Sequence, residues 1–119
     1  MNEERLGRQQ QLTEGVTLTI DTYTDRMMVS HLRFDAGATA PLHHHPEDEV
    51  NVVISGRFEC TVDGRKILLN PGDTVHVLAD QVHGLHAIEA GVVVSTWSPV
   101  RNDLLDIFVR GPGRPVLEG

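Results

Sequence analysis

The sequence predicts a single all-β domain, a small barrel or jelly roll, and three observations lead to that prediction. The chain has 119 residues, which is the size of one domain. From residue 16 onward, short runs of β-branched and apolar residues alternate with turn signals at nearly regular spacing. No stretch between residues 16 and 99 has a helical period, so we expect the strands to close on one another and leave few exposed edges.

The expected strands can be placed one by one. In chain order they cover residues 16–20, 27–34, 50–55, 58–62, 65–69, 74–78, 83–89 and 92–97. Asp63 and Gly64 form a strong two-residue hairpin signal, because both central positions of such a turn need positive φ. The run from Asn70 to Asp73, which reads Asn-Pro-Gly-Asp, marks a further turn.

Two terminal segments flank the expected barrel, which covers residues 15–101. Residues 1–14 are polar, and we expect an arm there: a loose segment, a short helix or a strand lent to a partner subunit. Residues 102–119 form a C-terminal extension, in which residues 102–108 are expected to be a capped short helix and residues 111–115 an irregular tail.

Charge and composition exclude some partners. The formal net charge is -7 and the pI about 5.3, which disfavours nucleic acid and anionic membranes as partners. The N-terminus has no signal-peptide pattern, and no apolar run is long enough to span a membrane. The one cysteine, Cys60, cannot form an intramolecular disulfide and is expected to be a small apolar filler on a strand. We therefore expect a cytoplasmic protein.

A histidine-rich segment between Gly37 and Gly56 is the first candidate for chemistry. His43 and His45 are two residues apart, so on a strand their side chains share a face and His44 points to the other side. Glu49 follows closely. Imidazoles and a carboxylate suit one divalent metal ion such as Zn, Fe, Mn, Ni or Co. A run of histidines is also found on solvated surfaces, so the segment alone leaves both interpretations open.

A second segment, from Gly72 to His83, places another histidine at the start of an expected strand. By itself, a histidine such as His83 is more often an ordinary strand or loop residue. Three neutral imidazoles and one carboxylate around an ion would leave positions open for water or substrate.

These two glycine-framed segments resemble the motifs of the cupin superfamily. The first motif, G-(x)5-H-x-H-(x)3,4-E-(x)6-G, is matched without a gap by Gly37, His43, His45, Glu49 and Gly56. The second, G-(x)5-P-x-G-(x)2-H-(x)3-N, is matched at Gly72 and His83, whereas Leu78, Asp80 and Ala87 replace its Pro, Gly and Asn. The resemblance implies a small cupin, a double-stranded β-helix or jelly-roll barrel. It also implies one bound metal ion with the ligands His43, His45, Glu49 and His83.

The last expected strand is similar to that of the KdgF-type pectin-degradation cupins, which ends in D-x-F-S-P-x-R. Ser98, Pro99 and Arg101 match, Trp97 replaces the Phe, and Ser95 replaces the Asp, a proposed catalytic residue of that family. Glu49 also stands where that family often has Gln. The resemblance implies action on 4,5-unsaturated uronates, which the family helps to convert into linear keto forms.

Candidate residues for substrate and catalysis follow from parity and residue type. Ser95 and Trp97 share one face of the last strand, so both are expected to face the metal if one does. Arg101 is a candidate clamp for a substrate carboxylate, or else a surface arginine after a Ser-Pro turn. Trp97 is a candidate wall of the substrate site, or else core packing. Ser95 is a poor general acid or base without an activating neighbour.

Further titratable residues are placed more loosely. His31 is the best spare acid–base candidate because its ordinary pKa lies near neutrality, although the sequence favours a half-exposed strand histidine over that role. Whether His31 faces the barrel interior or a dimer interface is left open by the register. His76 and His86 are out of phase with the motif positions and are expected to point outward or into an interface. Glu47 and the following Asp are expected to form a solvated rim.

Several functions use this ligand set. The first hypothesis is a metal-dependent enzyme acting on a small, anionic, oxygen-rich substrate, a sugar acid or keto acid, by isomerase- or lyase-type proton transfer. The alternatives are a dioxygenase using Fe, Mn or Ni, a polyketide cyclase, and a non-catalytic ligand-binding cupin. Because symmetric dimers are the commonest oligomers, we also expect a homodimer.

Overall fold

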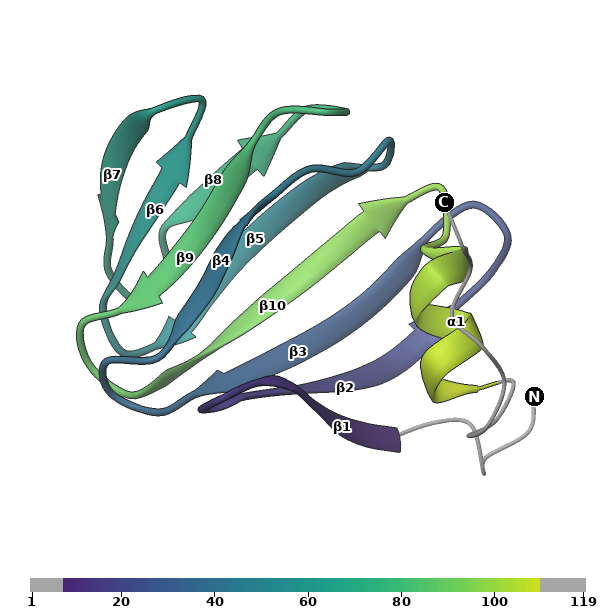
Figure 1. Cartoon of the computed structure of the whole chain (residues 1–119), viewed down its shortest axis with the longest axis horizontal. Coiled ribbons are helices and arrows are strands. Elements are labelled where there is room, and N and C mark those ends of the chain that lie inside the picture. The colour runs from purple at the N-terminus through teal and green to yellow at the C-terminus, as the bar shows by residue number, and fades with distance from the viewer. Residues whose placement is uncertain (1–7, 110–119) are drawn as a thin grey trace.

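The structure is a computed structural model that describes residues 8–109. Two antiparallel sheets face each other, and a helix lies at one end of them (Figure 1). In chain order the elements are β1 (Arg8–Thr13), β2 (Val16–Tyr23), β3 (Met28–Phe34), β4 (Thr39–His43), β5 (Asp48–Ser55), β6 (Phe58–Val62), β7 (Arg65–Leu69), β8 (Thr74–Val77), β9 (His83–Ala87), β10 (Gly91–Ser98) and α1 (Asn102–Phe108). The predicted all-β class is confirmed.

The two sheets differ in width. The larger has six strands in the order β1-β2-β3-β10-β5-β8, and the smaller has four in the order β4-β9-β6-β7. Consecutive strands thus cross between sheets at several points, as in a jelly roll. Among residues 8–109 the one helix, α1, has seven residues, so this part of the chain has no helix of the length and apolarity needed to cross a membrane.

The N-terminal segment differs from the predicted arm. Its described residues, Arg8–Thr13, form β1, which pairs antiparallel with β2 of the same chain and so extends the large sheet. Gly15 closes the β1–β2 turn at φ 77°. A second strand that the sequence did not indicate, β4, carries His43 at its end. Residues 1–7 and the predicted tail at 111–115 lie outside the described residues.

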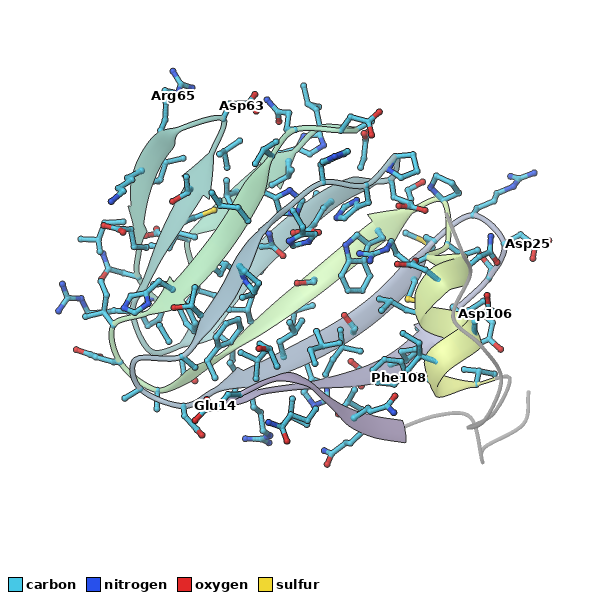
Figure 2. The ribbon with its side chains drawn as sticks, in the orientation of Figure 1. Glu14, Asp25, Asp63, Arg65, Asp106 and Phe108 are labelled. Carbon is cyan, nitrogen blue, oxygen red and sulfur yellow. The ribbon has the colours of Figure 1, made fainter. Side chains whose placement is uncertain are left out.

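The β6–β7 hairpin confirms the turn prediction. Asp63 has φ 48° and Gly64 has φ 80°, the positive values that this two-residue turn requires. In Figure 2 the labels on Asp63 and Arg65 mark the two sides of the turn at the edge of the small sheet. The hairpin fixes the register of β6, which pairs with β9 on its other side.

Apolar side chains fill the space between the sheets (Figure 2). On the strands they alternate with outward residues, and the Phe34 and Phe58 rings meet edge to face at 5.1 Å between centroids. The helix closes one end through Leu104, Leu105 and Phe108, all buried. Its N-cap is Arg101, which makes no capping hydrogen bond with its side chain, so the prediction of a capped helix is wrong in that detail.

The buried thiol of Cys60 gives a first testable consequence. Burial raises the pKa of Cys60 to about 11. Since only the thiolate reacts with disulfide reagents, the native protein at pH 8 is expected to react about 100-fold more slowly than the same protein unfolded in denaturant. A time course of Ellman's reagent at pH 8, with and without denaturant, checks this. Equal rates would contradict the buried placement.

Candidate metal centre

Three histidines converge at one end of the barrel. His43 is the last residue of β4 and lies directly opposite His83, the first residue of β9. His45 follows in the β4–β5 loop. One possible ligand atom from each ring lies within 4.8 Å of those of the other two, and the His43 and His83 ring centroids are 4.3 Å apart. The predicted convergence of the two motif segments is therefore present.

Backbone carbonyls orient all three rings. The Nδ1 of each ring lies near the carbonyl oxygen of a residue two positions away: 2.9 Å from His43 to Pro41, 3.1 Å from His45 to Glu47, and 2.8 Å from His83 to Gln81. A carbonyl oxygen only accepts, so each Nδ1–H donates, and the free lone pair of the neutral ring is at Nε2. These carbonyls are the orienting acceptors that metal-binding histidines use.

The polar atoms at the centre fit a cation. His83 Nε2 is buried and has no hydrogen-bond partner among the described residues. His45 Nε2 lies 3.0 Å from Glu49 Oε1, so that ring faces an acceptor at both nitrogens. A divalent metal ion would bind the lone pairs of these nitrogens and balance the carboxylate. Three imidazoles with a carboxylate suit Zn, Fe, Mn, Ni or Co, as predicted.

Glu49 borders the histidine cluster, and both of its carboxylate oxygens accept hydrogen bonds. Its Oε1 accepts a hydrogen bond from Trp97 Nε1 at 2.5 Å and lies 3.4 Å from His83 Nε2, while its Oε2 accepts one from Asn51 Nδ2 at 2.7 Å. Burial alone would raise the pKa of Glu49, but its polar neighbours, above all His45 and His83, hold that pKa well below its ordinary value. The carboxylate is therefore an anion that faces the cluster.

The surroundings shift the pKa values of His43 and His83 in opposite directions. Burial lowers the pKa of His43, and the nearby His83 adds to that effect, which favours the neutral ring that a metal needs. Burial would also lower the pKa of His83, but the Glu49 carboxylate raises it above its ordinary value.

Asn51 is a site residue that sequence reasoning missed. It is 1% exposed, donates to Glu49 Oε2, and accepts from Ser95 Oγ at 2.5 Å. A hydrogen-bonded chain thus links the Glu49 carboxylate to the Ser95 hydroxyl. The signal that could have found Asn51 is parity, because it lies two residues after Glu49 on the same face of β5.

Ser95 and Trp97 share the inner face of β10, as parity predicted. Both are buried, and in the register Ser95 lies opposite Asn51 while Trp97 lies opposite Glu49. Because the Ser95 hydroxyl proton is donated to Asn51, only the oxygen lone pairs remain for a ligand. Trp97 packs in the core and also lines the cavity beside the histidines, so its two predicted roles are compatible.

Arg101 is buried, which excludes the surface alternative. It is 8% exposed, and its guanidinium carbon lies 5.1 Å from the centre of the Trp97 ring. Its Nε and Nη2 donate to the two carboxylate oxygens of Asp103 at 3.0 and 2.8 Å. Burial would raise the pKa of Asp103, but Arg101 lowers it. Asp103 thus takes two of the five N–H donors of the guanidinium.

Glu47 corrects a further expectation. Its side chain is 12% exposed, and its Oε1 is buried, 3.5 Å from His45 Nδ1 and 3.7 Å from Arg101 Nε. It therefore lies between the histidine cluster and the guanidinium and not on a solvated rim. The other member of the predicted rim, Asp48, is exposed and accepts a hydrogen bond from the backbone of Ala79.

His31 is also placed differently from the acid–base interpretation. It lies on the outer face of β3, opposite in parity to the buried Leu32, and its Nδ1 is 2.9 Å from Asp21 Oδ2. The half-exposed alternative is the one that the structure supports, because the pleat turns residue 31 away from the barrel interior. His76 and His44 are exposed, as predicted. His86 also points away from the cluster and bonds to Thr39 on the outer face.

A cavity of about 130 Å³ opens beside the cluster. Its polar lining consists of His43, Glu49, His83, Ser95 and Arg101. Its apolar lining comes from Trp97 and from leucine and alanine side chains of both sheets and α1. Three of the four candidate metal ligands, His43, Glu49 and His83, therefore line the same cavity as the Ser95 hydroxyl and the guanidinium.

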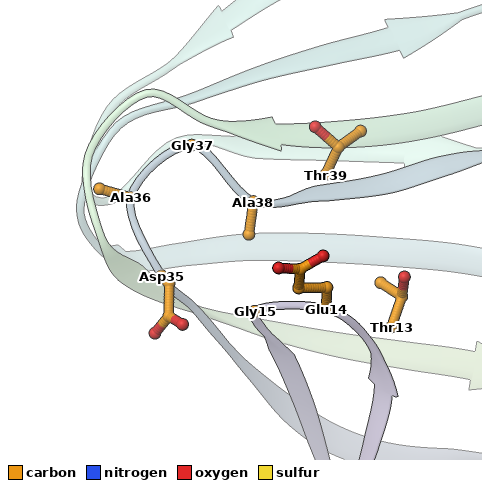
Figure 3. Close-up of a pocket in the computed structure, with 8 residues that line it drawn as sticks. All are labelled: Thr13, Glu14, Gly15, Asp35, Ala36, Gly37, Ala38 and Thr39. Atoms are coloured by element: carbon orange, nitrogen blue, oxygen red, sulfur yellow. The ribbon is translucent and has the colours of Figure 1, made fainter.

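A larger hollow of about 520 Å³ lies at the opposite end of β4 from His43 (Figure 3). It is formed by the β1–β2 and β3–β4 turns, and its lining includes the carboxylates of Glu14 and Asp35. Small residues make up most of the rest, with no histidine or cationic side chain among them. Its charge repels an anionic ligand, so the cavity beside the histidines is the better candidate site.

Comparison with known proteins gives consistent results. The cupin domain family matches residues 30–98. The pectin degradation protein KdgF of Dickeya dadantii (strain 3937) is 33% identical over 98 residues, which cover 81% of this chain and 89% of that protein. The structure of KdgF from Halomonas sp. is similar with a TM-score of 0.79 at 32% identity, covering 88% of this chain and 96% of that one. An RmlC-like cupin from Shewanella frigidimarina NCIMB 400 also gives 0.79, at 28% identity over 82% and 88% of the two chains.

Proposed function

The chain belongs to the cupin family, and from that premise we propose that it is a metal-dependent enzyme that moves a proton within a small anionic molecule, a sugar acid or a keto acid. One observation carries the proposal: two histidines of the cluster, His43 and His83, line the same cavity as the guanidinium of Arg101. A ligand that enters this cavity meets a cation site and an arginine together. Such a pair suits a carboxylate next to an enol or keto oxygen.

The proposed roles follow the geometry. His43, His45, His83 and Glu49 hold one divalent metal ion. When bound, the ion supplies a Lewis acid that polarises an enol or keto oxygen. Arg101 binds the carboxylate with the N–H donors that Asp103 leaves free, and Trp97 forms the adjacent wall. The homodimer, the cytoplasmic location and the identity of the metal stay predictions.

The similarity to the two KdgF proteins supports ketonisation as the reaction class. In such a step the enol O–H loses its proton and the enol carbon gains one, so that the C=C–OH unit becomes CH–C=O without any oxidant. In this chain Ser95 donates its hydroxyl proton to Asn51, so the Ser95 side chain holds and orients the ligand while another group delivers the proton.

Exchange of carbon-bound protons tests the proposal. The metal-loaded protein is expected to catalyse deuterium incorporation from D2O at the carbon next to the keto group of a 2-oxo acid, or ketonisation of an unsaturated uronate, as followed by NMR. Metal removal by a chelator should abolish the reaction, and re-addition should restore it. If metal-loaded protein accelerates neither reaction but consumes oxygen with the same acids, the dioxygenase alternative replaces the proposal.

A Ser95→Asp variant is expected to accelerate this proton transfer at least about tenfold, because a positioned general acid or base typically contributes about 10²–10⁴. The new carboxyl group would face the cavity from the position where the KdgF-type motif has its Asp. Thr96→Asp is the matched control, since Thr96 is on the same strand but points to the opposite face. Equal rates for both variants in the NMR assay would contradict the placement of residue 95 beside the bound ligand.

A further inference from the structure

We propose that the cavity selects a compact acid with an apolar body, such as a short-chain 2-oxo acid, over a polyhydroxylated sugar acid. This inference rests on the proposed function, because it takes the metal and Arg101 as the binding site for the acid group. It goes further by choosing between the two substrate classes. The argument comes from what surrounds the rest of the ligand.

The wall away from the metal is apolar. It is made by side chains from β1, β2, β3, β4, β9 and α1: Leu12, Leu18, Leu32, Ala40, Leu85 and Leu104. Four of these leucines are at most 8% exposed. None of the six side chains can donate or accept a hydrogen bond, so a hydroxyl placed against them loses its water and gains no partner.

The polar lining leaves few groups for additional hydroxyls. The Ser95 proton is donated to Asn51, so Ser95 can only accept a hydrogen bond from a ligand hydroxyl, and the two oxygens of Glu49 already accept from Trp97 and Asn51. The histidine Nδ1 atoms are bonded to backbone carbonyls. A sugar acid carries a hydroxyl on nearly every carbon, and most of these would remain unpaired.

The volume of the cavity also favours a compact acid with an apolar body. A cavity of about 130 Å³ is close to the roughly 150 Å³ space, lined by apolar side chains, that holds a benzene molecule. It suits an acid with a short alkyl body better than a hexuronate. Three of the wall residues, Leu12, Leu18 and Leu104, lie outside residues 30–98, where the cupin family matches. Selectivity is therefore set partly by β1, β2 and α1, while the metal ligands belong to the family core.

The test compares two acids of the same shape. In 2-oxobutanoate a methyl group occupies the position of the hydroxyl in 3-hydroxypyruvate. Cobalt-loaded full-length protein is titrated with each acid and with D-galacturonate, and binding is read from the visible cobalt spectrum and by calorimetry. We expect 2-oxobutanoate to bind about tenfold or more tightly than 3-hydroxypyruvate, because the buried hydroxyl lacks a partner.

Two variants test whether the apolar wall causes this preference. Leu12→Asn, at the rim of the cavity, is expected to reduce the preference about threefold, whereas Leu68→Asn, on β7 away from the cavity, leaves it unchanged. Equal or tighter binding of 3-hydroxypyruvate or galacturonate would overturn this inference and leave the proposed function standing. If the protein binds no Co²⁺, or if none of the three acids binds the cobalt-loaded protein, both proposals fall.

Discussion

Replacement of His83 by alanine is expected to lower the affinity for Zn²⁺ or Co²⁺ at least about 100-fold. Binding free energies of about 10–16 kcal/mol for sites with four protein ligands correspond to about 3 kcal/mol per ligand, or a factor of about 100. His83 Nε2 is buried without a hydrogen-bond partner among the described residues, and its other polar neighbour is Glu49 Oε1 at 3.4 Å, so its loss removes a ligand without breaking a hydrogen bond of that atom. Competition with a metal-binding dye gives the affinity directly.

His86→Ala is the matched control for this experiment. His86 is on the same strand, β9, but points to the outer face and bonds to Thr39. Its removal should leave the metal affinity unchanged. Thermal unfolding of both metal-free variants separates lost ligation from lost folding. Equal affinities for the His83 variant and the wild-type protein would contradict the assignment of His83 as a ligand.

Replacement of Gly56 by alanine is expected to reduce the free energy of unfolding by about 3 kcal/mol, the sum of left-handed backbone strain and overpacking. Gly56 follows β5 with φ 82°, and a Cβ there would lie 2.5 Å from the carbonyl oxygen of Ala90 and 2.8 Å from Gly91 Cα. Both contacts are to backbone, which cannot swing aside. Urea denaturation of the metal-free protein measures the loss.

Gly37 supplies the control, because it frames the other end of the same motif segment. Its φ of 81° is nearly the same, but a Cβ there would meet nothing within 4 Å. Gly37→Ala should therefore cost only the backbone strain, about 1 kcal/mol. If both variants lost the same stability, the close approach between Gly56 and Ala90 would not be the cause.

Local patterns explain why much of the fold was predictable. The Asp63-Gly64 hairpin follows from the conformations that two residues must adopt, whatever surrounds them. Asp80 is a related case: it replaces the motif glycine, yet it keeps a positive φ of 64°, and its N–H donates to the His45 carbonyl at 2.8 Å. Aspartate tolerates this conformation better than most residues, so the loop that supports His45 is retained.

Tertiary contacts explain what the sequence did not show. The alternation of side chains along a strand placed Ser95 and Trp97 on one face of β10. The same alternation does not say which face of β3 is buried, so the orientation of His31 was undecided until the partner strands were known. The strand β4 is short and contains Pro41, which hides its pattern. The position of α1 against the sheets determines the pairing of Arg101 with Asp103 and the apolar wall of the cavity. No single segment of the sequence predicts that position.

The most direct measurement of the central claim is a crystal structure of the cobalt- or zinc-loaded protein with anomalous scattering recorded at the metal edge. We predict one anomalous peak per chain, from a metal ion that is bound by Nε2 of His43, His45 and His83 at about 2.0–2.1 Å. A structure in which the ion binds elsewhere, or in which His83 is not a ligand, would contradict the account of this site.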